Sequence, residues 1–397
     1  MSIQYVQLGD VVKLQAGIGF PLNLQGKTIG AYPFAKVGDI SRCGRSGASI
    51  LPSADHYVDK EDIESLRAKL VPEGSVLFAK IGEAIRQNHR VIAGCDLLID
   101  NNAMAAIPSE KIEGRFLYHY LKTVDFYRLA PATTVPALRK SDLARLLVPL
   151  PPLSEQRRIS IILDSVEALC SKRRKALFQI DRLAQSIFVE MFGDPLLNSQ
   201  KLPLKKLSEV SLFENGDRSS NYPSGDDIKE SGVLFLSTKN ISNSRLDLSK
   251  YRSYISQEKF NSLSRGKTKK NDLLITLRGT LGSCCIFDGE HETAFINAQM
   301  MIIRPDHSII SRYLHALLTS PQFKDMFSRI GRGAAVPQLT SAQLSEITIP
   351  TPSLADQLEF SSRLQAVDAL RRRQEQSCFE LNTLFATLRF RAFRGKL

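Results

Sequence analysis

The chain contains the same pattern twice. The stretch 148–156, VPLPPLSEQ, returns 201 positions later at 349–357 as IPTPSLADQ. The proline spacing and the final pair of an acidic residue and a glutamine are retained. A Val-Pro-x-Leu motif at 135–138 recurs at 336–339 with the same offset. Self-similarity of this kind indicates two tandem copies of about 200 residues each.

Upstream of these motifs the offset drifts to 196–199, as insertions and deletions in loops would make it. The segment 74–82 aligns with 271–279, and the opening 8–11 aligns with 207–210. Residues 101–104 (NNAM) align with 297–300 (NAQM). Within each copy the first three quarters consist of short apolar runs broken by Gly, Pro, Asn and Ser, which predicts strands and loops.

The last quarter of each copy predicts a long helix. Residues 154–192 contain no proline or glycine, and their apolar residues recur at alternating steps of three and four. This heptad pattern gives a helix of nearly forty residues, about 58 Å long, that ends at Gly193. Shifting by 201 predicts a second helix over 355–397. The expected apolar seam consists of Ile159, Ile162, Val166, Leu169, Ile180, Leu183 and Ile187 in the first helix and Phe360, Val367, Leu370, Leu381, Leu384 and Leu388 in the second.

Both seams turn polar at the middle, at Arg173 in the first helix and at Gln374 and Ser377 in the second. Repeats that pair through a long helix commonly do so about a pseudo-twofold axis, which makes the helices antiparallel and brings the two midpoints together. We therefore expect an α+β protein with two α/β globules, 1–153 and 193–354, joined by antiparallel helices 154–192 and 355–397 in a pseudo-twofold coiled coil. The alternative is that both helices simply pack inside one globule.

Composition favours a polyanionic partner. Lys and Arg number 53 against 41 Asp and Glu, a net charge of +12 that is spread over all four segments. The six cysteines form no CxxC motif, and no spacing of histidines suits a metal, which argues against a structural zinc ion. Adjacent Cys284 and Cys285 lie in an apolar run and are expected to be buried thiols. No membrane-length apolar run and no signal peptide are found, so we expect a cytoplasmic protein without membrane contact.

No motif for catalysis is found. Both Gly-Lys-Thr sequences, at 26–28 and 266–268, lack the upstream glycine of a P-loop. The glycine pair at 17 and 19 faintly suggests a cofactor-binding turn, but the second copy does not keep it. The Asn- or Asp-Pro-Pro-aromatic tetrapeptide of amino-methyltransferases and the G-x-S-x-G elbow of hydrolases are also missing. The pattern indicates a binding protein that binds no cofactor of its own.

With these observations, the chain resembles the specificity (S) subunits of type I restriction-modification systems. The resemblance covers the whole chain and rests on the doubled Pro-rich entry to a long helix, 149–156 and 350–357. It rests also on Asp-Leu-Leu-Ile at 272–275 followed by the glycine-containing loop 278–282. The first copy departs from the family at 82–86, where a second glycine is expected.

The resemblance implies that each globule is a target recognition domain, which reads one half of a split double-stranded DNA site, while the helices set the spacing between the halves. It implies no catalysis by this chain. Two methyltransferase (modification) subunits would bring S-adenosylmethionine for adenine methylation, and restriction or motor subunits would bring ATP and Mg. Domains held at a set separation reach one face of a duplex about one turn, roughly 10 base pairs, apart.

Candidate DNA contacts are those in loops that combine basic groups with hydrogen-bond donors, because Arg and Lys pair with guanine and Asn and Gln with adenine. In the first copy these are Lys36, Arg42, Arg45, Lys80, Arg86, Gln87, Asn88, His89 and Arg90. In the second copy they are Lys239, Asn240, Arg245, Arg265, Lys267, Lys269, Lys270, Arg278, Thr280 and Ser283.

Two other hypotheses compete with DNA recognition. A coiled-coil scaffold whose globules bind proteins or another polyanion predicts no preference among DNA sequences. A stand-alone nucleic-acid enzyme predicts activity from the purified chain alone.

Overall fold

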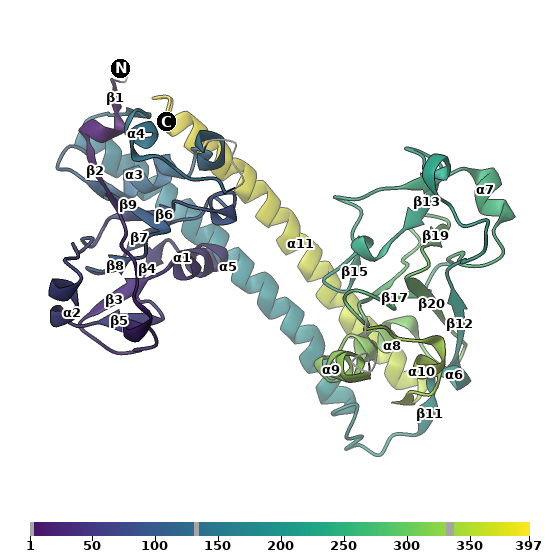
Figure 1. The fold of residues 1–397 in the computed structure, drawn as a ribbon. Helices are drawn as coiled ribbons and strands as arrows, with labels where there is room; N and C mark the ends of the chain where they lie inside the picture. Colours follow the sequence, from purple (N-terminus) through teal and green to yellow (C-terminus); the bar gives the residue numbers. More distant parts are fainter. Residues whose placement is uncertain (1–3, 131–134, 331–336) are drawn as a thin grey trace. The chain divides into compact units, whose positions relative to one another are not determined.

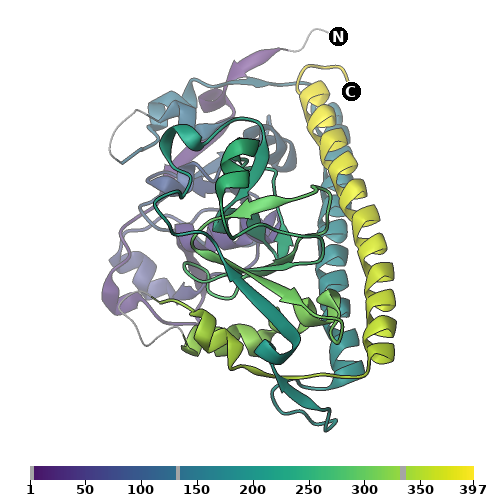
Figure 2. The same ribbon diagram turned by 90° about the vertical axis from the view of Figure 1, so that its right-hand side faces the viewer.

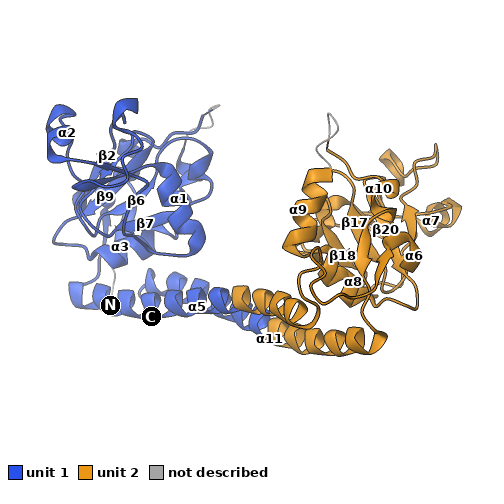
Figure 3. Ribbon diagram, turned by 90° about the horizontal axis from the view of Figure 1, so that it is seen from below, with its two compact units in different colours: residues 1–176, 374–397 blue, residues 177–373 orange. Residues whose placement is uncertain are grey.

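The computed structural model describes residues 4–130, 135–330 and 337–397. Val336, part of the second Val-Pro-x-Leu motif, lies outside the described residues. The chain forms two compact units (Figures 1 and 3): unit 1 comprises Met1–Ala176 and Gln374–Leu397, and unit 2 comprises Leu177–Arg373. Each unit therefore takes one half of each long helix, α5 (Leu153–Phe192) and α11 (Leu354–Ala392), and does not end where the helices begin.

Unit 1 is built on a five-stranded sheet of order β2-β9-β6-β7-β4. A three-stranded sheet of order β5-β3-β8 and the antiparallel pair β1-β10 complete its strands. The core lies between the large sheet, the helix α3 and the long helices, where Phe116 of α3 packs edge-on against Phe393 with ring centroids 5.2 Å apart. The bounds are β1 Tyr5–Gln7, β2 Val12–Ala16, β3 Tyr32–Ala35, α1 Val37–Ser46, β4 Ile50–Leu51, β5 His56–Val58, α2 Lys60–Ser65, β6 Val76–Ala79, β7 Arg90–Ala93, β8 Leu98–Ile99, β9 Ala103–Pro108, α3 Gly114–Leu121, α4 Lys140–Ala144 and β10 Leu147–Pro149.

Unit 2 repeats this plan, as the duplicated sequence predicts. Its sheets have the orders β12-β20-β17-β18, β16-β13-β19 and β11-β21, and the hairpin β14-β15 follows β13 where unit 1 has α1. The core is an aromatic cluster in which Tyr313 of α8 meets Phe188, Phe192 and Phe360 of the long helices. The bounds are β11 Leu204–Lys206, α6 Leu207–Val210, β12 Ser211–Asn215, β13 Val233–Leu236, β14 Ile241–Ser242, β15 Arg245–Leu246, β16 Tyr254–Ile255, α7 Gln257–Ser262, β17 Leu273–Thr276, β18 Cys284–Ile286, β19 Ala294–Ile296, β20 Met300–Pro305, α8 Ser311–Leu318, α9 Pro321–Ile330, α10 Ser341–Ser345 and β21 Thr348–Pro350.

Strand register corrects one part of the repeat alignment. The backbone N–H of Lys80 donates to Asn102 O at 2.7 Å, and the equivalent N–H of Leu277 donates to Gln299 O at 2.8 Å. The offset here is therefore 197, and the alignment of 101–104 with 297–300 is one residue out of register. The shared Asn-x-x-Met letters misled it, because hydrogen-bonded register and not residue identity decides structural equivalence.

A glycine after the first long strand of each unit is required by close packing and not by a cofactor. A Cβ on Gly17 would stand 1.9 Å from Asp100 O, and one on Gly216 would stand 2.3 Å from Asn297 O. These two glycines occupy equivalent positions after β2 and β12. The expectation that the second copy does not keep this glycine turn is therefore wrong. In both units the backbone passes too close to a neighbouring segment to leave room for a side chain.

The glutamine that ends each Pro-rich motif is buried and anchors the start of the long helix. In unit 1, Gln156 Oε1 accepts from the N–H of Glu113 at 2.8 Å, and its Nε2 donates to Lys111 O and Pro151 O. In unit 2, Gln357 makes the same three bonds, to the N–H of Ile310 at 2.7 Å and to Ser308 O and Pro352 O. Both side chains are fully buried, so the repeated motif is explained by these bonds.

Within each unit the local halves of α5 and α11 run antiparallel (Figure 2). In unit 1, Arg158 bonds Leu397 O at 3.0 Å, while Arg173 Nη1 donates to Gln374 Oε1 at 2.6 Å. The expected meeting of the two polar midpoints is thereby confirmed. In unit 2, Arg363 approaches Glu190 at 3.6 Å, and Arg371 pairs with Asp181.

The expected heptad seam holds only in part. The structure buries Ile159, Ile180, Phe360 and Val367, and Ile162, Val166, Ile187, Leu381 and Leu388 are half-buried. Leu169, Leu183, Leu370 and Leu384 are exposed, which corrects the prediction for these four. Next to two of them, Cys170 and Phe385 are buried instead. A straight helix turns once per 3.6 residues, so a strict 3.5-residue pattern drifts off the packed face.

Candidate nucleic-acid interface

The loops that follow β6 and β17 begin in the same way. Gly82 and Gly279 both have left-handed backbone, with φ of +83° and +81°. An isolated bridge then ties each loop to a segment upstream of the Pro-rich motif, Ile81 to Ala137 in unit 1 and Arg278 to Gln338 in unit 2. The duplication has thus kept the backbone at the start of the loop, while the side chains and the length of the rest of the loop differ.

In unit 1, the densest predicted run lies over residues 86–90. Arg86 is exposed, stacks over Tyr127 and donates to its hydroxyl at 2.6 Å. Asn88, at φ +52°, donates from Nδ2 to Val124 O at 3.2 Å. Gln87 is exposed, and His89 is half-buried, where burial lowers the pKa of its imidazole.

Arg90 lies in the interior of unit 1. Only 3 % of it is exposed, and its guanidinium sits 3.6 Å from the ring centroid of Phe126. It donates to His89 O at 2.8 Å and to Asn88 Oδ1 at 2.7 Å, and burial lowers the pKa of Arg90 to about 9. Arg90 therefore stabilises the loop through Asn88 and His89 from the interior of unit 1, and we remove it from the candidate contacts.

The remaining candidates of unit 1 lie near α1. Lys36 donates to Gln25 Oε1 at 2.6 Å, beside the ring of Phe20. Arg42 is engaged by Asp55 and Asp39, each at 2.6 Å. Arg45 is exposed, and Lys80 is half-buried at the end of β6.

In unit 2, the first group of candidates serves mainly the fold. Asn240 is 3 % exposed, accepts from the N–H of Ser237 at 2.9 Å and donates to Tyr251 O at 2.8 Å, so it too leaves the candidate set. Lys239 is exposed over the ring of Tyr251.

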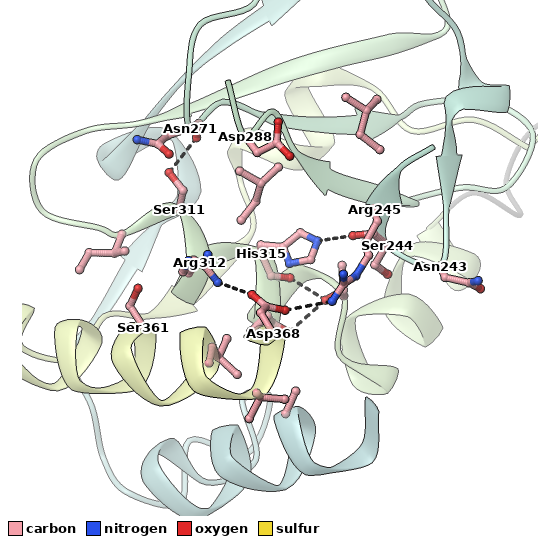
Figure 4. A pocket seen from close by; sticks show the side chains of 18 of the residues that line it. Asn243, Ser244, Arg245, Asn271, Asp288, Ser311, Arg312, His315, Ser361 and Asp368 are labelled. Atoms are coloured by element: carbon pink, nitrogen blue, oxygen red, sulfur yellow. Dashed lines mark hydrogen bonds and ion pairs between the residues drawn. The ribbon is translucent and has the colours of Figure 1, made fainter. Parts of the chain in front are cut away.

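Arg245 lines a groove of about 1600 Å³ between α8, the β14-β15 hairpin and the long helices of unit 2 (Figure 4). Asp368 of α11 binds Arg245 at 2.9 Å and Arg312 of α8 at 2.6 Å. The imidazole of His315 contacts Ser244 O at 3.0 Å and Cys284 O at 3.2 Å. Arg245 thus anchors the hairpin to α11, a role that sequence analysis did not foresee.

The basic run 265–270 forms part of the surface of unit 2. Arg265, Lys269 and Lys270 are exposed, whereas Lys267 lies 4.8 Å from the ring centroid of Phe260. Cys284 and Cys285 lie in β18, which pairs with β17. Both are fully buried, as expected, and burial raises the pKa of Cys285 to about 12.

The loop after β17 carries the last three candidates. Arg278 and Thr280 are exposed, and the N–H of Ser283 donates to Thr276 Oγ1 at 3.0 Å. Arg278 opens onto a hollow of about 360 Å³ that sequence analysis missed. It is lined by Arg218, Tyr222, Arg278, Asn297, Ala298 and Gln299. These residues are up to 81 positions apart in sequence, and only the pairing of β12 and β17 with β20 brings them together.

One cluster in the described part of the chain is compact enough to hold a metal ion: His119, Asp164 and Glu167. Each carboxylate already has partners. Asp164 binds His119 at 2.8 Å and Arg115 at 3.3 Å, and Glu167 binds Lys122 at 2.7 Å. We interpret the cluster as an ion-pair network that fastens α3 to α5. No helix among the described residues is both long and apolar enough to cross a membrane.

Comparison with known proteins identifies the family. The model of the type I restriction modification DNA specificity domain matches the chain twice, over residues 2–178 and 202–377. The chain therefore belongs to the family of type I restriction-modification DNA specificity proteins and carries two copies of their domain.

Two relatives are named as specificity subunits of type I restriction enzymes. The type I restriction enzyme EcoBI specificity subunit of Escherichia coli is 26% identical over 325 residues, covering 73% of this chain and 67% of its own. A putative type I specificity subunit of Haemophilus influenzae is 26% identical over 327 residues, covering 79% and 80%. These proteins are named as specificity subunits, in agreement with the expectation that catalysis lies outside this chain.

Solved structures share the fold. The S subunit of a type I restriction-modification system from M. genitalium has a TM-score of 0.56 at 15% identity, covering 99% of this chain and 96% of its own. A chain from a study of complex assembly and conformational transition of a type I system has a TM-score of 0.55 at 20% identity, covering 100% and 98%.

Proposed function

We propose that this chain reads a bipartite double-stranded DNA site, one half with each target recognition domain, within a type I restriction-modification complex. We assign the two domains to residues 1–153 and 193–354, and the spacer between the half-sites to the long helices α5 and α11. The observation that carries the proposal is the duplicated loop after β6 and β17. The start of the loop has the same backbone in both copies, with a left-handed glycine at 82 or 279 and a bridge one residue before it, while Ile81 in one copy is replaced by Arg278 in the other. Beyond that start the loops differ in length, ten residues before β7 against seven before β18. Two copies of one scaffold with different exposed side chains suit the reading of two different half-sites.

The partners of this proposal are two adenine methyltransferase subunits, which supply S-adenosylmethionine, and restriction or motor subunits, which supply ATP and Mg. Exposed apolar side chains on the helices support two equivalent docking surfaces. Phe178 is 64% exposed and Phe379, its equivalent 201 positions later, is 67% exposed. Eleven residues after each, about three helical turns, Val189 and Phe390 are exposed on the same side of their helices. Such repeated apolar patches are typical of protein interfaces.

Mutation of one patch tests this part of the proposal. Phe379→Glu should remove one of the two methyltransferase subunits from the complex, and Phe178→Glu with Phe379→Glu should remove both, as measured by the mass of the purified complex. Ser65→Glu, an exposed change on α2 that adds the same charge, should leave the mass unchanged. Retention of both subunits by the double variant would disprove this docking.

The DNA-binding proposal is tested by the methylome. Cells that carry this chain with its methyltransferase partner should show adenine methylation at a split motif, and binding of the complex to that motif should fall steeply with added salt. Absence of a split motif, with equal binding to all DNA, would favour the scaffold hypothesis. We also propose that the protein acts in the cytoplasm, because the DNA that it would recognise lies there.

A further inference from the structure

The hollow at the end of β17 concentrates hydrogen-bond donors. Two arginines, Arg218 and Arg278, and the amide side chains of Asn297 and Gln299 line it together with Tyr222. Among the described residues that line it there is no carboxylate that would repel a phosphate or a base edge rich in acceptors. The hollow therefore suits an anionic ligand that presents acceptors, which is the character of DNA.

Arg278 is held in one orientation while its end stays available. Its Nε donates to Gln338 Oε1 at 3.2 Å, and its two terminal nitrogens have no hydrogen-bond partner among the described residues. Arg218 is fixed similarly, through one bond from Nη2 to Ala298 O at 3.0 Å. The exposed side-chain amide of Gln299 has no partner in the described part of the chain, although its backbone N–H donates to Asn297 Oδ1 at 3.2 Å.

Unit 1 keeps the scaffold of this hollow without its two arginines. The bridge that joins Arg278 to Gln338 joins Ile81 to Ala137 in unit 1. Gly19 stands where unit 2 has Arg218, two residues after the close-packed glycine. Because the backbone needs neither arginine, their presence in one copy only indicates a ligand specific to that copy.

We infer that the hollow reads a guanine in the half-site of the second domain, through the terminal nitrogens of Arg278. This inference rests on the proposed function and adds the base to it. Guanine presents O6 and N7 to the major groove, and the fork of an arginine donates to both at once. The bond from Nε to Gln338 orients that fork before binding, which lowers the entropy lost when both donors engage the base. Arg218 and Gln299 flank the guanine and contact its neighbours.

The test compares methylomes of cells that carry the methyltransferase partner with the unaltered chain, Arg278→Ala or Arg278→Lys. The unaltered chain should methylate a split motif with a guanine in the half assigned to the second domain. Arg278→Ala should relax that guanine, with discrimination at one position falling roughly ten- to a hundred-fold, and should leave the other half-site unchanged. Lysine keeps the charge and can still donate to guanine but lacks the fork, so Arg278→Lys should relax the guanine less than Arg278→Ala does. Loss of a phosphate contact would instead weaken methylation of all sequences alike.

Arg329→Ala is the matched control, because Arg329 is an exposed arginine of unit 2 that pairs with Asp325 one helical turn away. It should leave the motif unchanged. Retention of the full motif by Arg278→Ala, with or without weaker overall methylation, would overturn the guanine contact while leaving the proposed function intact. An unaltered chain that yields no split motif would instead overturn the proposed function, and this inference with it. Persistence of the other half-site in the variants shows that they fold.

Discussion

Replacing Gln357 by leucine should loosen the joint between the second domain and its long helix. The side chain is fully buried and bonds the N–H of Ile310 at 2.7 Å, Ser308 O at 3.1 Å and Pro352 O at 2.9 Å. Three bonds at roughly 1 kcal/mol each give about 3 kcal/mol, and the stranded N–H of Ile310 adds about 1–2 kcal/mol. Leucine has a similar volume, so the loss comes from hydrogen bonds and not from a cavity.

Hydrogen exchange of the Ile310 amide measures this loss locally, which suits a chain of two units that need not unfold in one step. A loss of about 4–5 kcal/mol corresponds to exchange that is faster by roughly three to four orders of magnitude. Gln156→Leu should act in the same way on the amide of Glu113 and leave Ile310 protected. Gln376→Leu, on an exposed part of α11, should change neither amide. Unchanged protection of Ile310 in the Gln357→Leu protein would refute the argument that this motif is a structural anchor.

Three further outcomes follow from individual contacts. Gly216→Ala should lower the free energy of unfolding by about 2–4 kcal/mol in a urea titration, because the new Cβ would stand 2.3 Å from a carbonyl oxygen. Gly38→Ala should raise it by about 0.5–1 kcal/mol, because Gly38 lies in α1 and its new Cβ would have no atom within 4 Å. Arg90→Lys should cost about 2–3 kcal/mol, because lysine cannot make both bonds and stack on Phe126, yet should leave the methylation motif unaltered. Asp368→Asn should remove two ion pairs and cost about 1–3 kcal/mol, seen as faster hydrogen exchange in the β14-β15 hairpin and α8, with no such change in unit 1.

The duplicated plan and both long helices could be predicted because their signals are local. A helix without proline or glycine needs only its own residues, and the observed starts at Leu153 and Leu354 differ by one residue from those expected. The antiparallel pairing followed from the pseudo-twofold symmetry expected of a repeat, and the contact of Arg173 with Gln374 at the two polar midpoints confirms it within unit 1. The seam was less accurate, since a heptad count cannot say which turns of a helix pack against α3 and α8.

The candidate contacts show where local signals end. Density of donors along the chain identified Arg278, but equally identified Arg90 and Asn240, which lie inside the protein. Burial depends on which segments pack over a residue, and those segments are distant in sequence. For the same reason Arg218 and Gln299 were missed, although both line one hollow with Arg278.

The sequence by itself therefore determined the repeat, the strand-and-helix character of each copy and the family, because residue pattern and motif identity carry that information along the chain. Tertiary structure alone decided which basic residues reach the surface, the true register between the copies and the gathering of Arg218, Arg278 and Gln299 around one hollow. Each of these depends on hydrogen bonds between strands far apart in sequence, and no local pattern encodes which strands will pair.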